Sequence, residues 1–388
     1  MLESSNACLT FNTAAQQGAG LQFAGQLSSI PAIDEEGRIR LPGFPAGLSI
    51  EAYLPLVHAY TRILEASRLL DRYRHALRAP HFSSSSAITA QSPLTPLQRS
   101  VKLQNLYYKR EDLTVTRAYK VRGAVVGMAK HMEDRHQSRF LTVSTGNHAL
   151  GVLQAAMLLK PAALKIVAPC NTAQGKLKKL NLALAQANAQ GIQAALLLKG
   201  ETFDQARDWA LKNATEQECY LDPYNDPWVV AGQGTLGLEL YEQIRLALAN
   251  QQYEELVLVS PVGGGGLLNG TATALRLASA WDPAFRNLSV RFEGLRLADF
   301  DEPLGAAIQV DKIALPNVAA LAGLNVEMSS MAVDDMRQGM NFAKADINAQ
   351  AEGASGGAIW RARQLAMETQ SRRTAQRLSL AILSGGNI

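Results

Sequence analysis

Apolar runs rich in β-branched residues alternate with helical patterns over residues 106–383. The runs 140–143 and 256–259 carry no charged residue, which is typical of strands that are buried on both faces. Helical spacing of apolar residues follows them over 147–159 and 266–278. Such alternation favours an α/β fold, in which a mostly parallel sheet has helices packed on both faces.

The first 86 residues break this pattern. Residues 1–47 are rich in Gly, Ser, Ala, Gln and Pro, and we expect them to form an irregular, loosely attached extension. Apolar residues at helical intervals predict one helix over 50–77, which ends before Pro80 and the serine run 83–86. Hydrophobic residues make up 47% of the 388 residues and charged residues 19%, so the chain can bury a large core.

Composition excludes several classes of protein. A net charge of +4 is too small for a dedicated nucleic-acid binder, and no apolar run is long enough to span a membrane. The three cysteines, Cys8, Cys170 and Cys219, are too far apart for a disulfide scaffold or a thiolate zinc site. The N-terminus has no secretory signal pattern, so we expect a cytoplasmic protein.

The cationic cluster Lys176-Leu177-Lys178-Lys179 is typical of a solvated helix face, with an anion site as the alternative.

A lysine lies near the start of the helix predicted over residues 118–131. Lys120 lies in the run Ala118-Tyr119-Lys120-Val121-Arg122-Gly123, where a polar loop that follows a strand meets the helix. The positive end of a helix dipole favours the neutral form of a lysine, and a neutral amine attacks aldehydes to form imines. An ordinary surface lysine is the alternative, so the case for Lys120 depends on its neighbours in the fold.

The run Ser144-Thr145-Gly146-Asn147-His148 stands between a predicted strand and a predicted helix. Unpaired main-chain amides at such a helix start bind carboxylates or phosphates. Asn147 can also offer both a donor and an acceptor to a ligand. The alternative is an ordinary helix cap by Ser144 or Asn147, with His148 satisfied in the first turn.

Two further runs follow the ends of predicted strands. The tetraglycine loop, Gly263-Gly264-Gly265-Gly266, comes after the buried strand at 256–259, and consecutive glycines let main-chain amides surround an anion. Its pattern is neither that of a dinucleotide-binding turn nor that of a Walker loop. Ser384, in Ser384-Gly385-Gly386-Asn387, follows the last predicted strand, where ligands of open α/β sheets bind.

Together these residues supply an imine-forming amine, two sets of anion donors and a hydroxyl, which is the set that pyridoxal 5′-phosphate (PLP) requires. The motifs, in this order, resemble the fold-type II PLP enzymes and, among them, the serine/threonine dehydratase group. Lys109-Arg110-Glu111-Asp112 and Asp222-Pro223-Tyr224-Asn225-Asp226-Pro227 add to the resemblance. It covers about residues 87–388 of the chain.

The resemblance implies a fold and a role for each matching residue. Two open twisted sheets flanked by helices would form a large PLP-binding domain (87–138 and 223–388) and a small substrate-loop domain (139–222), after an N-terminal extension with one helix (1–86). Lys120 would bind PLP through an imine and later carry the α-proton of the substrate. Asn147 would bond the 3-hydroxyl of the ring, the tetraglycine loop its phosphate, and Ser384 its nitrogen.

Other matching residues would surround the substrate or a metal. The substrate carboxylate would bind at Ser144, Thr145, Gly146, Asn147 and His148, with Glu352 near the cofactor and Gly323 in the pocket wall. Thr145 matches a position where racemases carry a serine as a second acid or base. As in serine racemases and some dehydratases, Mg²⁺, Mn²⁺ or Ca²⁺ would be held by Glu293, the carbonyl of Leu297 and Asp299. Two surface acids are the alternative to this cation site.

The function implied by the resemblance is a β-elimination. A small β-hydroxy amino acid, such as serine, threonine or 3-hydroxyaspartate, would lose its β-hydroxyl and yield a 2-oxo acid and ammonia. A β-replacement, a racemisation and a non-catalytic PLP-binding role stay open as alternatives. The expected partners are a small amino-acid substrate and, by the resemblance, a second copy of the chain in a homodimer.

Overall fold

The computed structural model describes residues 32–33, 39–40, 50–79, 93–249, 253–280, 282–298, 303–305, 308–310, 313–372 and 376–387. By its internal contacts the chain divides into residues 1–31, all outside the described part, and 32–388, to which the rest of this section applies. The loose extension expected over residues 1–47 therefore lies outside the described residues. The exception is a short antiparallel pair of strands, β1 (Ala32–Ile33) and β2 (Ile39–Arg40).

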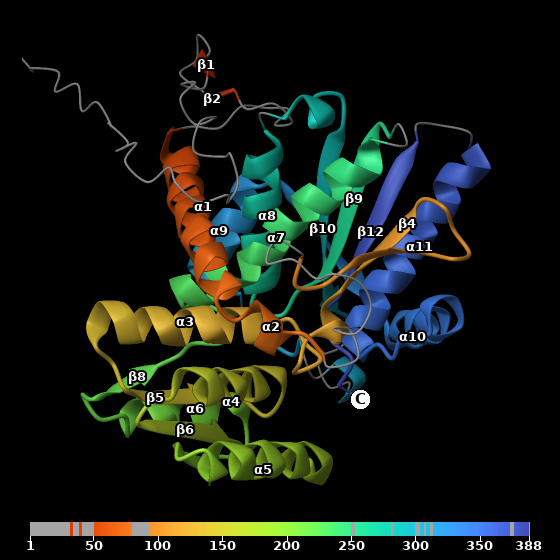
Figure 1. The fold of residues 1–388 in the computed structure, drawn as a ribbon. Coiled ribbons are helices and arrows are strands. Elements are labelled where there is room, and N and C mark those ends of the chain that lie inside the picture. The colour runs from red at the N-terminus through yellow and green to blue at the C-terminus, as the bar shows by residue number, and fades with distance from the viewer. Residues whose placement is uncertain are drawn as a thin grey trace, which may run out of the picture. The chain divides into compact units, whose positions relative to one another are not determined.

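The largest of the three sheets in the described part of the chain has six strands. They are β3 (Leu97–Arg99), β4 (Leu106–Arg110), β9 (Glu255–Pro261), β10 (Ser289–Leu297), β11 (Val326–Met331) and β12 (Arg377–Leu383). Their order is β11-β10-β9-β12-β4-β3, and all neighbours are parallel except β3 and β4 (Figure 1). The central strands β9 and β12 are buried almost throughout, as their apolar runs predict.

The smaller sheet has four parallel strands. They are β5 (Arg139–Val143), β6 (Ala163–Ala168), β7 (Gln193–Leu198) and β8 (Glu218–Tyr220), in the order β7-β6-β5-β8. The predicted α/β fold with two sheets flanked by helices is thus confirmed. Except for β3, the strands of both sheets lie within residues 106–383, where the alternating pattern was found. The domain boundaries at 86, 138 and 222 stay a prediction.

Helices cover both faces of the six-stranded sheet (Figure 1). On one face lie α10 (Val333–Ile347) and α11 (Gly353–Arg372), and on the other α7 (Pro227–Leu248), α8 (Gly266–Ser279) and α9 (Leu315–Gly323). Between the sheets lies α3 (Lys120–Arg135), while α4 (Asn147–Leu159), α5 (Gln174–Ala189) and α6 (Phe203–Lys212) surround the smaller sheet. In the described part of the chain, the structure contains no helix with the length and hydropathy of a membrane span.

The helix expected over 50–77 is two helices, because the chain turns at Arg72 and Tyr73. They are α1 (Ile50–Asp71) and α2 (Arg74–Leu77). Helix α1 packs against α7 and α8, and Ile63 and Ala66 on its inner face are 1% and 0% exposed. This helix is therefore part of the core of the molecule.

The apolar spacing of residues 236–248 predicts a helix there, but α7 begins nine residues earlier, at Pro227. The stretch before 236 contains Gly232 and Gly234, and glycine lowers helix propensity. In the structure these glycines allow close packing: a Cβ at Gly232 would lie 2.7 Å from Cα of Gly123 in α3. Tertiary packing of α7 on α3 outweighs the weak local preference.

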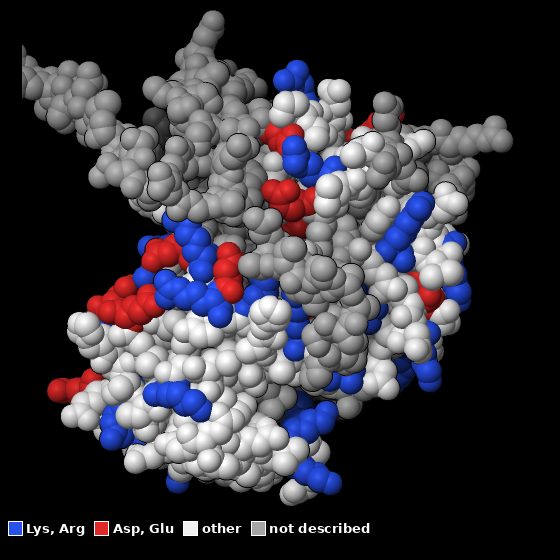
Figure 2. Space-filling view, viewed as in Figure 1, with Lys and Arg blue, Asp and Glu red and all other residues white. Residues whose placement is uncertain are grey.

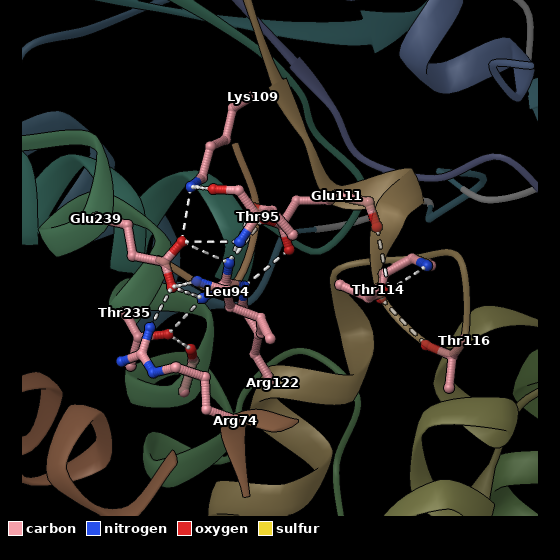
Figure 3. A network of polar contacts seen from close by, with 12 residues as sticks. Arg74, Leu94, Thr95, Lys109, Glu111, Thr114, Thr116, Arg122, Thr235 and Glu239 are labelled. Atoms are coloured by element: carbon pink, nitrogen blue, oxygen red, sulfur yellow. Dashed lines mark hydrogen bonds and ion pairs between the residues drawn. The ribbon is translucent and has the colours of Figure 1, made fainter. Parts of the chain in front are cut away.

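A network of buried charges lies between α3, α7 and β4 (Figure 3). The guanidinium of Arg122 donates to Glu111 (Nε to Oε2, 2.8 Å) and to Glu239 (Nη1 to Oε1, 2.9 Å), and Nζ of Lys109 lies 2.7 Å from Oε2 of Glu239. Burial alone would lower the pKa of Arg122, but the two glutamates raise it above its usual range. Lys109 and Glu111 of the run 109–112 thus hold the helix that carries Lys120 through Arg122 and Glu239. Removing one partner would leave a buried charge unpaired.

Candidate functional site

The loops after β5, β9 and β12 meet at one cavity. The carboxyl ends of parallel strands share one edge of a sheet, where open α/β folds bind ligands. The cavity has a volume of about 880 Å³. Its lining includes every residue expected to contact cofactor or substrate except one: Lys120, Ser144, Thr145, Gly146, Asn147, His148, Gly263, Gly264, Gly265, Gly266, Glu352 and Ser384.

Lys120 is the first residue of α3 and is 7% exposed. Its Nζ donates to the carbonyl of Pro223 at 2.7 Å and lies 4.4 Å from the centre of the Tyr224 ring. Burial lowers the pKa of Lys120 to about 7, although the carboxylate of Asp222 opposes the change. A large share of this amine is therefore neutral at physiological pH, which is the form that attacks an aldehyde.

The turn between β5 and α4 presents main-chain amides to the cavity. The hydroxyl of Ser144 accepts hydrogen bonds from the amides of Gly146 and Ala149, both at 3.2 Å, and so satisfies one amide in the first turn of α4, whose N-cap residue is Gly146. Among the described residues no hydrogen bond is made by the amides of Thr145, Asn147 and His148. These three amides remain available to an anion.

His148 is buried at the start of α4, with 3% of its surface exposed. Burial, and then the positive charge of Lys120, lower the pKa of His148 to about 3, while the main chain of Leu221 opposes this. The imidazole is neutral across the physiological range, so it adds no charge to the site.

Asn387 was not assigned a role from the sequence, although it ends the run Ser384–Asn387 that was singled out. Its Nδ2 donates to Oδ1 of Asn147 at 2.8 Å. This bond leaves Nδ2 of Asn147 to donate to Oε2 of Glu352 at 2.9 Å. Burial raises the pKa of Glu352, and the bond from Asn147 opposes that rise. Asn387 therefore sets the direction in which the amide of Asn147 points.

The tetraglycine loop follows β9 and leads into α8. A Cβ at Gly264 would lie 2.4 Å from the Tyr224 ring, and Gly265 has a φ of +89°, which other residues rarely adopt. No side chain caps the first amides of α8, which begins at Gly266. The loop and the helix start together form a cradle of main-chain donors for an anion such as a phosphate.

Ser384 follows β12 and ties the end of the chain to Lys120. Its carbonyl accepts a hydrogen bond from the amide of Tyr119 at 3.0 Å, directly before the start of α3. Its hydroxyl lies 3.1 Å from the hydroxyl of Ser355. Ser384 is 2% exposed and lines the cavity, so its hydroxyl can bond a ligand atom there.

Gly323 and the described residues of the expected cation site do not line this cavity. Gly323 ends α9 and is not among the lining residues, so its place in the pocket wall stays a prediction. Asp299 lies outside the described residues. Oε1 of Glu293 accepts a hydrogen bond from Nε of Arg361 at 2.6 Å, so a guanidinium supplies the positive charge beside this acid. Within the described stretches, no group of three His, Cys, Asp or Glu side chains is placed to hold a metal ion, and a cation site with Leu297 is not supported.

A family model described as pyridoxal-phosphate dependent enzyme matches residues 86–367. The chain belongs to this family of PLP-dependent enzymes. The residues present fit the cofactor: a buried amine with a lowered pKa stands in the same cavity as a glycine cradle whose shape a Cβ would disturb. Lys120 would hold the aldehyde carbon of PLP, and the tetraglycine loop would hold its phosphate.

Curated relatives of this PLP-dependent enzyme include threonine lyases. The L-threonine ammonia-lyase of Thermotoga maritima is 28% identical over 84% of this chain and 75% of its own length. The biosynthetic L-threonine dehydratase of Bacillus subtilis is 33% identical over 56% of this chain and 49% of its own length. Other relatives are matched over less of their length, such as 29% for the mitochondrial threonine dehydratase of Schizosaccharomyces pombe.

Solved structures share the fold of this PLP-dependent enzyme. The processed form of threonine deaminase isoform 2 from Solanum lycopersicum superposes with a TM-score of 0.65 at 24% identity, covering 93% of this chain and 96% of that one. Maize serine racemase superposes with a TM-score of 0.64 at 19% identity, covering 85% and 93%. Both likenesses concern the fold, since lyases and racemases share it.

Proposed function

We propose that this chain is a PLP-dependent ammonia-lyase that eliminates water from a small β-hydroxy amino acid, such as threonine or serine, and releases a 2-oxo acid and ammonia. The observation that carries this proposal is the buried, largely neutral Lys120 amine in one cavity with two main-chain anion cradles. The names of the threonine ammonia-lyase and dehydratase relatives support it. The chemistry supplied by bound PLP is the withdrawal of electrons from the substrate α-carbon.

The residues of the chain divide the remaining work. The free amides of Thr145, Asn147 and His148 would bind the substrate carboxylate and so fix the α-carbon. Nζ of Lys120, once released, would accept the α-proton, and the β-carbon–oxygen bond would break with its electron pair leaving on the hydroxyl. Asn147, held by Asn387, would bond the 3-hydroxyl of the ring. The hydroxyl of Ser384 would bond the ring nitrogen without stabilising a positive charge there, which favours rapid elimination.

Product analysis tests this function. The PLP-loaded protein is incubated with L-threonine, L-serine and L-threo-3-hydroxyaspartate, and products are identified by mass spectrometry. A 2-oxo acid with an equal amount of ammonia is expected, and Lys120→Ala should lose at least about 10³-fold in rate because both the covalent link and the base are removed. Unchanged substrate with every candidate would overturn the proposal and favour a non-catalytic PLP-binding role.

Racemisation is a second candidate because Thr145 lines the cavity and carries a hydroxyl that can act as an acid or base. Appearance of the D-enantiomer as the main product would support it. Formation of a new carbon–sulfur or carbon–nitrogen bond when O-acetylserine and a thiol or amine are supplied would favour β-replacement.

We also propose that the enzyme is a cytoplasmic homodimer, as the family resemblance implies. Light scattering during size-exclusion chromatography would give the mass directly. A mass of about 84 kDa, twice the chain mass of 41.8 kDa, is expected for a dimer.

A further inference from the structure

Two lysines of α5 belong to the wall of the cavity. Lys176 and Lys179 both line it, together with Asn171 and Thr172 of the loop that precedes the helix. Residues three apart lie on one face of a helix, so both ammonium groups approach the cavity from the same side. Lys178, between them, is not part of the lining. The cationic cluster of residues 176–179 therefore has one face in the site and one face outside it.

The start of α5 is also positively polarised. Its N-cap residue is Ala173, which has no side-chain oxygen to bond the first amides of the helix. The positive end of a 16-residue helix and two lysines thus face the same space. Figure 2 shows Lys and Arg side chains gathered over the end of α5 that lies nearest to the C-terminus of the chain.

Lys176 has no fixed counter-charge. In the described part of the chain it forms neither a hydrogen bond nor an ion pair, and the carboxylate that attracts it is that of Glu352. Glu352 already accepts two hydrogen bonds from Asn147. Glu201, the other acid in the lining, is exposed to solvent, as are Lys176 and Lys179 themselves at the mouth of the cavity. A cation that the protein leaves without a partner in its own binding cavity is suited to a charge on the ligand.

When the side chain of the substrate is uncharged, every anionic group in the site has a binding partner other than these lysines. The tetraglycine loop would take the cofactor phosphate, and the turn between β5 and α4 would take the substrate carboxylate. Threonine and serine carry no further negative charge, so neither would engage Lys176 or Lys179. A substrate with a charged side chain would.

We propose that Lys176 and Lys179 form a third anion site, which selects amino-acid substrates whose side chain carries a negative charge of its own. Such a charge is present as a β-carboxylate in 3-hydroxyaspartate and as a phosphate ester in O-phosphoserine. In the first substrate the β-hydroxyl leaves and the carboxylate stays. In the second the carbon–oxygen bond breaks and the electron pair leaves with the phosphate. This inference deepens the proposed function and rests on it for turnover, but not for binding.

Kinetics with paired substrates test the selection. The PLP-loaded protein and the variant Lys176→Gln/Lys179→Gln are compared on L-threo-3-hydroxyaspartate, O-phospho-L-serine, L-serine and L-threonine. The double variant should lose about 10- to 100-fold in kcat/KM for the charged substrates and change by less than about threefold for the neutral ones. Lys178→Gln is the matched control and should behave as the unaltered protein. A loss on one charged substrate alone would show whether carboxylate or phosphate is recognised. Equal losses on all four substrates, or no loss on any, would overturn the proposal.

Binding separates this proposal from the proposed function. L-Aspartate and L-asparagine have nearly the same shape, differ in one charge, and carry no hydroxyl to eliminate. Their dissociation constants are measured from the absorption change of the PLP-loaded protein. Aspartate should bind at least about 10-fold more tightly than asparagine, and this ratio should fall to near one in the double variant and at high salt. Equal affinity in the unaltered protein would overturn the third anion site even if threonine is turned over. A preserved ratio with no elimination of any substrate would instead overturn the lyase and leave the site standing.

Discussion

At the scale of single residues, Lys120 shows how burial changes chemistry. An amine with its usual pKa would be neutral in roughly one molecule in 300 at pH 8. The enclosed position at the start of α3 lowers the pKa of Lys120 to about 7, so most of the amine is neutral at pH 8. The reactivity of this residue therefore comes from its surroundings.

The first prediction concerns the pH dependence of cofactor uptake. Because the neutral amine reacts and its pKa is lowered, the rate of PLP incorporation into the apo-protein should rise with pH and level off above a midpoint near 7. Asp222 stabilises the charged form, so Asp222→Asn should shift the midpoint to lower pH. Stopped-flow absorption measures both. A rate that still rises tenfold per pH unit between 8 and 10 would show that the amine is unperturbed.

The second prediction concerns Asn387. Replacing it with alanine removes the donor that orients Asn147, so PLP affinity should fall by about 2- to 10-fold, the value of one hydrogen bond. Asn387→Asp should lose more, since a carboxylate cannot donate to Oδ1 of Asn147. Equilibrium dialysis gives the PLP dissociation constants. Asn213→Ala, which removes an exposed bond to Trp209, should leave the affinity unchanged.

At the scale of helices and strands, the approach of α3 to α7 decides where Lys120 lies. The two helices meet at Gly123 and Gly232, where a Cβ on Gly232 would be 2.8 Å from the carbonyl oxygen of Arg122. The buried ion pairs of Arg122 with Glu111 and Glu239 hold the same contact from the side (Figure 3). A shift of α3 by a few tenths of an ångström would move the amine relative to the glycine cradle.

The third prediction follows from this contact. Gly232→Ala should lower the free energy of unfolding by about 1–3 kcal/mol, because an added methyl in a close-packed contact forces the helices apart. It should also weaken PLP binding, since α3 carries Lys120. Gly175→Ala in α5 is the control: no atom lies within 4 Å of its Cβ position, so stability should stay constant or rise by up to about 1 kcal/mol. Urea unfolding and PLP titration measure the two effects. Equal stability of both variants would mean that the contact has room for a side chain.

At the scale of the whole molecule, α1 lies outside the family match but inside the core. The family model begins at residue 86, whereas α1 ends at Asp71 and packs on α7 and α8. A Cβ at Gly234 of α7 would lie 2.6 Å from Cδ1 of Ile63, so the helices are in close contact. Helix α1 therefore supports α7, and α7 in turn holds α3 in place.

The fourth prediction tests that support. Ile63→Ala should lower the free energy of unfolding by about 2–4 kcal/mol, through lost apolar burial and the cavity left behind. Leu54→Ala on the same helix, where the side chain is 45% exposed, should change it by less than about 0.5 kcal/mol. Denaturant unfolding of both variants provides the comparison. Similar small effects would mean that α1 is dispensable to the fold.

The local sequence pattern does not predict several helices and strands, for identifiable reasons. Helix α10 and strand β11 were not predicted, because their surfaces mix buried and exposed residues without a clean period. The run 290–292 predicts only a short strand, whereas β10 continues to Leu297, since its charged residues pair with neighbours: Arg291 donates to Glu255 and Glu327, and Glu293 accepts from Arg361. Such pairing is invisible in a local pattern.

By itself the sequence determined the α/β alternation, a helix that begins close to Lys120, and the loops of the cavity, because burial period and glycine runs are local properties of a chain. Only the tertiary structure decided the rest. It gave Glu293 a guanidinium partner and brought Asn387 to Asn147 across 240 residues. It also placed Lys176 and Lys179 in the wall of the cavity. Which distant side chains meet depends on how whole helices pack, and no local spacing contains that information.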